Sequence, residues 1–210
     1  MPDSRRSETV LTSHSVEEFF EGALCDALKD QRTQASAHTV DYVVNVLTVF
    51  SRSDRLYEQT EAGVGLKPLA MLYADAVYSN DPAKRAESLR RLGDVALFIS
   101  GLFSHSLNRK LVDVDYYVAM GGGAYSELSS AGASRHTTGV PGNVFAELAQ
   151  KFSRFVDALA EISKDASFNN DSDLLRTYEL WMRTGSQRAA DVLRRAGIVP
   201  HSQTCTNTQH

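Results

Sequence analysis

The sequence predicts an all-α protein, a single-domain bundle of six or seven helices. Apolar residues recur at three- and four-residue spacing in most segments, and no set of segments suggests strands that could pair with one another. The chain has 210 residues, 42% of them hydrophobic, which suffices for one substantial core. We expect the helical domain to span residues 14–199, between disordered polar tails at 1–13 and 200–210.

The first two helices are expected within residues 15–31 and 37–51. Ser15 is placed to cap the first helix, with Glu18 as its capping-box partner. The second segment is rich in valine, whose β-branched side chain favours strands. Its apolar stripe is longer than a typical strand, so we predict a helix there as well.

Proline and glycine mark the boundaries in the middle of the chain. The stretch 63–65, Gly-Val-Gly, predicts a loop before a helix whose first turn holds Pro68. Asp81 is expected to cap the next helix, which begins at Pro82. From Val95 onward this helix is apolar nearly all round, so its second half should be central and buried.

Two further helices are expected after a glycine-rich loop at 132–142, the best candidate for a mobile segment. Residues 143–165 carry apolar side chains at a period of 3.6, and Asn143 is placed as their N-cap. The last helix is expected within residues 173–197.

Three consecutive glycines at 121–123 admit three interpretations. A strand followed by a phosphate-binding loop is disfavoured, because the spacing matches neither GxGxxG nor GxxxxGK[ST]. A helix through the glycines loses about 1 kcal/mol for each one relative to alanine. Close packing on Gly93, Ala96 and Gly101 of the preceding helix would offset that loss, and we favour this interpretation. The third is a helix broken beside a bound ligand.

The densest polar cluster, SHSLNRKLVDVDYY at 104–117, precedes the glycines. It suggests either a site for an anionic ligand or a helix connection in which an aspartate caps the next helix, and we favour the connection. The carboxylate of Asp94 lies on a buried apolar helix and needs a partner, so we expect an internal ion pair with an arginine. The candidate ligand-binding residues are Arg91, Asp94, His105, Arg109, Asp113, Asp115, Tyr117, Gly121, Gly122 and Gly123.

Common catalytic and metal-binding templates do not match the sequence. HExxH, GxSxG, SxxK and ExxH do not occur, and the two cysteines lie in no metal-binding spacing. We therefore expect no catalytic residue, no metal and no cofactor.

A net charge of −4 lacks the basic footprint of nucleic-acid binders. The apolar run at 95–103 is too short to span a bilayer, and the first twenty residues lack the apolar core of a secretory signal. We expect a cytoplasmic protein without nucleic-acid or membrane partners.

Residues 90–128, RRLGDVALFISGLFSHSLNRKLVDVDYYVAMGGGAYSEL, resemble a segment of bacterial all-helical proteins without known function. The stretch LRRAGIVP near the C-terminus fits the same resemblance, which covers most of residues 15–200. It implies a bacterial origin and no particular activity.

The leading functional expectation is a non-catalytic interaction protein, an adaptor or regulator, with a homodimer as one form of contact. The alternative is a bundle that binds a small ligand or cofactor beside the glycine helix, with an enzyme as a special case. A pocket beside the glycines lined by Asp94, Arg91 and Tyr117 would favour the alternative. A dense contact at the glycines together with an exposed apolar patch elsewhere would favour the interaction protein.

Overall fold

The computed structural model describes residues 13–51, 53–56, 58–60, 63–104, 114–131 and 139–165, and isolated positions between 177 and 198. Apart from Ser13, both predicted tails lie outside the described residues, as does most of the predicted mobile loop at 132–142. Within the last predicted helix, the described positions 177, 181, 190, 191, 193 and 194 are helical.

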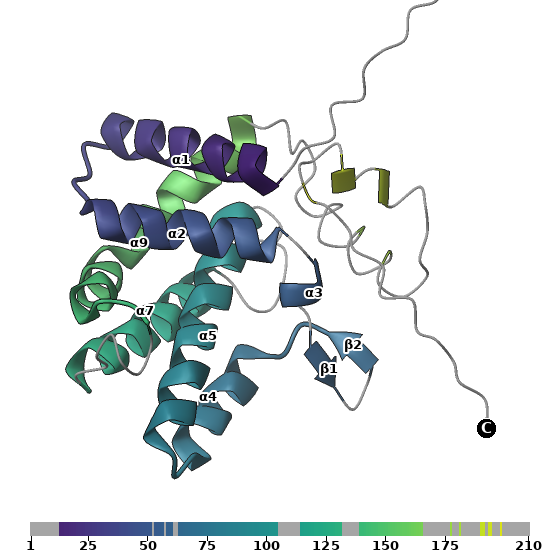
Figure 1. Ribbon diagram of the computed structural model, residues 1–210, viewed down its shortest axis with the longest axis vertical. Coiled ribbons are helices and arrows are strands. Elements are labelled where there is room, and N and C mark those ends of the chain that lie inside the picture. The colour runs from purple at the N-terminus through teal and green to yellow at the C-terminus, as the bar shows by residue number, and fades with distance from the viewer. Residues whose placement is uncertain are drawn as a thin grey trace, which may run out of the picture.

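The all-α prediction is confirmed by the described elements (Figure 1). The helices are α1 (Ser13–Asp30), α2 (Ala37–Phe50), α3 (Ser53–Leu56), α4 (Leu69–Tyr78), α5 (Pro82–Leu102), α7 (Val114–Ser130) and α9 (Gly142–Asp165). A small antiparallel hairpin, β1 (Glu58–Thr60) with β2 (Gly63–Gly65), stands where the sequence predicted only a loop. Three-residue strands are too short to show a period of two, and backbone pairing rather than side-chain pattern holds them.

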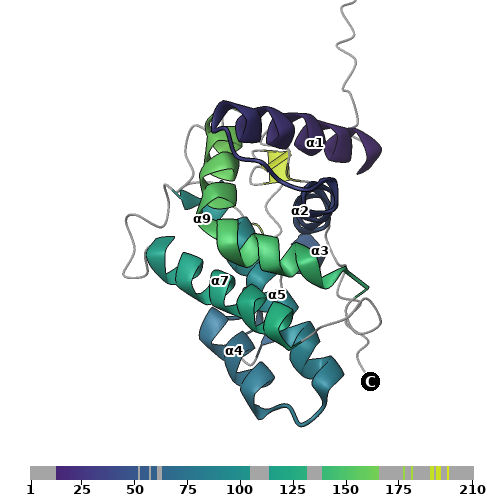
Figure 2. The same ribbon diagram turned by 90° about the vertical axis from the view of Figure 1, so that its left-hand side faces the viewer.

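Helix α5 is the central element of the bundle (Figures 1 and 2). It contacts α2, α4, α7 and α9. Every residue from Leu92 to Phe103 is buried, which confirms the predicted burial of its second half. Helix α1 packs on α2 and α9 at one end of the molecule, and α4 lies on α5 at the other end.

The observed helix ends agree to within two residues with the ends predicted from the sequence. The Asp81 carboxylate accepts a hydrogen bond from the Ala83 backbone N–H at 2.9 Å, so Asp81 caps α5 as predicted. Helix α1 begins at Ser13, which places Ser15 in its first turn rather than at its cap. Asn143 likewise lies in the first turn of α9. Such shifts are expected, because an additional half-turn changes few contacts.

Candidate functional site

The three consecutive glycines lie within α7, which runs through them without a break. A Cβ added to Gly121 would lie 2.7 Å from Ala96 Cβ on α5 and closer still to the ring of Phe152 on α9. An added Cβ at Gly122 would make only ordinary contact with Phe152, and at Gly123 it would meet open space. Close packing therefore explains the first glycine and not the other two.

Two glycines of α5 were predicted to receive the glycines of α7, and both face something else. Gly93 faces the ring of Tyr125 from α7, whose Cδ1 would lie 2.8 Å from an added Cβ. Gly101 faces Leu159 of α9, whose Cδ1 would lie 2.7 Å away. The predicted close packing on α5 is therefore confirmed at Ala96, which contacts Gly121. It is wrong for Gly93 and Gly101, because large side chains fill the space beside them.

Asp94 is the polar centre of the buried half of α5, with 9% of its surface exposed. Its Oδ1 accepts hydrogen bonds from the hydroxyls of Tyr42, at 2.5 Å, and Tyr125, at 2.8 Å. Burial raises the pKa of Asp94, although these hydrogen bonds and the charges of Arg90 and Arg91 lower it. The sequence predicted an ion pair and did not predict the tyrosines, which come from α2 and α7.

The two tyrosine hydroxyls keep their protons. Burial raises the pKa of Tyr42 and of Tyr125 well above the usual value, and the nearby Asp94 carboxylate raises both further. Both hydroxyls therefore act as hydrogen-bond donors, and together they hold the carboxylate in one orientation between three helices.

A cleft of about 660 Å³ opens beside Asp94, and we call it the α2–α5 cleft. Arg91 in its wall is held in place, because its Nη2 donates to the Leu56 carbonyl at 2.8 Å. Its guanidinium carbon also lies 4.7 Å from the ring centre of Phe50. The lining residues are Tyr42, Asn45, Val46, Val49, Phe50, Arg55, Leu72, Asp75, Glu87, Ser88, Arg90, Arg91, Asp94 and Val140.

Of the predicted site residues that the structure describes, only Arg91 and Asp94 come together in this cleft. Tyr117 is half-buried on α7 with its ring 5.7 Å from that of Tyr116, and burial raises the pKa of Tyr117. Asp115 is exposed in the first turn of α7, where a negative charge suits the helix N-terminus. Neither residue lines the α2–α5 cleft, and nor do Gly121, Gly122 and Gly123. His105, Arg109 and Asp113 lie outside the described residues.

The side of α4 that faces away from α5 is apolar, and we call it the α4 outer face. Among its large side chains, Met71, Val77 and Tyr78 are 58%, 47% and 82% exposed. The inner side of the helix holds buried leucines and an alanine instead. The α4 outer face consists of Ala70, Met71, Tyr73, Ala74, Val77 and Tyr78.

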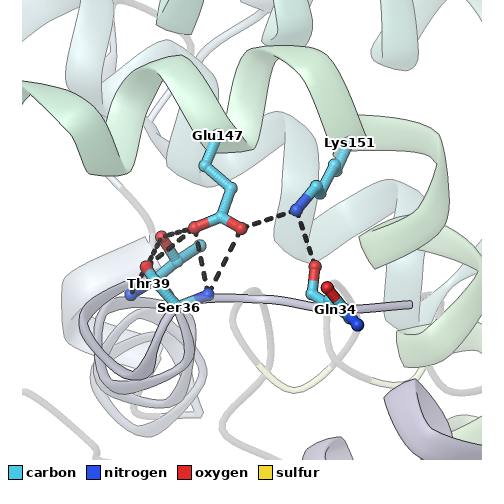
Figure 3. Close-up of polar contacts among 5 residues, drawn as sticks. All are labelled: Gln34, Ser36, Thr39, Glu147 and Lys151. Carbon is cyan, nitrogen blue, oxygen red and sulfur yellow. Dashed lines mark hydrogen bonds and ion pairs between the residues drawn. The ribbon is translucent and has the colours of Figure 1, made fainter. Parts of the chain in front are cut away.

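Glu147 of α9 binds the N-terminus of α2, a contact that the sequence did not predict (Figure 3). Its carboxylate accepts hydrogen bonds from the hydroxyls of Ser36 and Thr39, each at 2.7 Å, and from the Ser36 backbone N–H at 3.2 Å. Lys151, where α9 is kinked, donates to Glu147 at 2.7 Å and to the Gln34 carbonyl at 2.6 Å. This polar cluster joins two helices that are far apart in sequence.

The pKa of Glu147 reflects burial opposed by several hydrogen bonds. Burial favours its neutral form, but the hydrogen bonds from Lys151, Thr39 and Ser36 outweigh burial and lower its pKa from 4.5 to about 2. The cluster uses its donors internally, so it is a structural connection rather than a ligand site.

Among the described residues, no three His, Cys, Asp or Glu side chains gather in a way that could hold a metal ion. None of the helices in the described ranges has the length and apolar character needed to cross a membrane. No protein-family model matches the chain, and no curated protein or solved structure shows significant similarity to it. The resemblance to bacterial helical proteins therefore stays a prediction.

Proposed function

We propose that this protein is a non-catalytic interaction module, an adaptor or regulator, and that the α4 outer face is its contact surface. We further propose that this face binds α4 of a second copy of the chain, so that the protein forms a homodimer. The observation that carries the proposal is the apolar character of an exposed helix side, from Met71 to Tyr78. The cytoplasmic location expected from the sequence belongs to the same proposal.

The size of the α4 outer face fits a contact surface. Its side chains expose roughly 500 Å², given that a large aromatic side chain covers about 150–250 Å². Patches of about 300–600 Å² are the largest on typical monomers and often functional. Two copies of the face would bury about 1,000 Å² together, which reaches the lower limit of a specific interface.

The charge pattern of the face suits contact with itself. Its six residues carry no charge, so a two-fold pairing brings no like charges together. An ion pair flanks it on each side, Lys67 with Asp75 at 2.5 Å and Arg85 with Glu127 at 3.3 Å. Each flank therefore presents both signs to a second copy.

The packing around α7 supports an interaction protein over a ligand site at the glycines. The side of α7 at Gly121 is filled by Ala96 of α5 and Phe152 of α9, which leaves no room there for a ligand. Tyr117, predicted as part of such a site, does not line the α2–α5 cleft.

Sedimentation equilibrium of the full chain tests the proposal. We expect a monomer–dimer equilibrium at micromolar concentrations, with Tyr78→Glu shifting it to monomer because a buried unpaired carboxylate opposes association. Phe19→Glu on α1 is the matched control, since Phe19 is an exposed aromatic residue far from α4. A wild-type chain that stays monomeric, or equal weakening by both variants, would contradict the proposal.

A further inference from the structure

The carboxylate of Asp94 offers one oxygen to a molecule in the α2–α5 cleft. Both tyrosine hydroxyls donate to Oδ1, and within the described part of the chain no group donates to Oδ2. Asp94 is nine-tenths buried and also lines the cleft. A buried carboxylate held in one orientation, with an oxygen left for a further donor, is a pre-organised binding group.

The charge on Asp94 is incompletely compensated by its surroundings. Burial raises its pKa despite the two hydrogen bonds and the positive charges of Arg90 and Arg91. An incoming ammonium group would supply the missing compensation, because a charged donor binds a buried carboxylate more strongly than a neutral one does.

The rest of the lining provides positive charge and apolar walls. Arg90 and Arg91 lie close enough to act on Asp94 by their charge, so both signs occur within a small part of the cleft. Val46, Val49 and Leu72 form apolar wall, and Val49 is 36% exposed. The volume of about 660 Å³ lies in the range of small-molecule sites.

We propose that the α2–α5 cleft binds a small zwitterion with an apolar body, of the class of apolar amino acids and their short peptides. The ammonium group bonds to Asp94 Oδ2, the carboxylate faces the arginines, and the apolar body lies on the valines of α2. This site shares no residue with the six of the α4 outer face, although Asp75 borders both, and it goes beyond the contact proposed for that face.

Three probes with the same phenyl group separate the contributions of the two charges. L-phenylalanine carries both charges, phenethylamine carries only the ammonium, and 3-phenylpropionate carries only the carboxylate. We expect isothermal titration of the full chain at millimolar probe to rank L-phenylalanine first. Failure of all three probes to bind, or equal binding of 3-phenylpropionate and L-phenylalanine, would overturn the proposal.

Two variants test the roles of the residues. Asp94→Asn keeps an acceptor for the tyrosine hydroxyls. It should lower the affinity for L-phenylalanine by about tenfold or more while leaving the binding of 3-phenylpropionate unchanged. Val49→Trp fills the cleft and leaves Asp94 unsubstituted, so this variant should bind none of the three probes. Asp157→Asn on the exposed side of α9 is the matched control and should bind like the wild type. Unchanged affinity for L-phenylalanine in Asp94→Asn would refute the assigned role.

Discussion

The carboxylate of Glu147 on α9 accepts a hydrogen bond from the hydroxyl of Thr39 on α2, at 2.7 Å. Thr39 is fully buried, and its backbone N–H is capped by the Ser36 hydroxyl at 3.3 Å. One carboxylate thus completes the N-terminus of α2 and connects it to α9 (Figure 3).

Glu147 should make the free energy of unfolding depend on pH in the acid range. Its pKa is about 2 when folded and 4.5 ordinarily, so its contribution is complete above pH 4.5 and is lost as pH falls toward 2. We expect Glu147→Gln to lower the free energy of unfolding by about 1–3 kcal/mol at neutral pH. The difference from wild type should shrink in the acid range, as measured by denaturant titration at several pH values.

Glu17→Gln provides the control for this prediction, because Glu17 lies on the exposed side of α1. We expect the free energy of unfolding of Glu17→Gln to lie within about 0.5 kcal/mol of the wild-type value. A constant difference between Glu147→Gln and wild type from neutral to acid pH would show that the carboxylate charge does not matter.

Gly121 and Gly123 of α7 are a matched pair of positions, one tightly packed and one facing open space. Gly121→Ala should destabilise the protein by about 1–3 kcal/mol, because the new methyl group overlaps Ala96 and Phe152. Gly123→Ala meets open space and should stabilise it by up to about 1 kcal/mol through helix propensity. Thermal unfolding followed by circular dichroism measures both, and the same sign of change in the two variants would contradict the packing.

Asp94 should affect stability in the opposite pH direction to Glu147. Because burial raises its pKa, the stability that it contributes is greatest below 3.8 and is lost as pH rises through the folded value. Asp94→Asn should therefore be more stable than wild type at neutral pH and lose that advantage in acid. Denaturant titration at neutral and acid pH checks this, and a variant less stable at neutral pH would show that the tyrosines and arginines overcompensate burial.

The tyrosines that hold Asp94 should each contribute measurably. Tyr42→Phe and Tyr125→Phe each remove a hydrogen bond to a buried carboxylate, which costs about 1.5–3 kcal/mol. Since both donate to the same oxygen, we expect the double variant to differ from the sum of the single ones. Urea unfolding of the three variants measures this, and losses within experimental error would mean that water replaces the hydroxyls.

Local patterns were sufficient for most helices. The 3.6-residue period predicted residues 143–165, and Asp81 with Pro82 predicted the start of α5, because caps and apolar stripes act over a few residues. The kink at Lys151 was not predicted. The contact of Lys151 with Gln34 spans 117 positions, which is beyond the reach of a local pattern. The hairpin at 58–65 was missed because its pairing is a backbone property.

The candidate site was predictable only in part. A carboxylate on an apolar helix marked Asp94 as needing a partner, but its partners are 52 and 31 positions away on other helices. No local signal distinguished Tyr42 or Tyr125 from other tyrosines on the predicted helices. The α4 outer face also required the structure, because the amphipathic pattern does not show which apolar side stays exposed.

The sequence by itself determined the longer described helices, their ends to within two residues and the burial of the second half of α5. Propensity, capping and periodicity are set by neighbours within one or two turns. Tertiary structure decided which side chains meet: the ring of Tyr125 at Gly93, the tyrosines at Asp94 and Glu147 at the start of α2. These contacts depend on how α2, α5, α7 and α9 are placed relative to one another. That placement follows from packing over the whole core, which no short stretch of sequence contains.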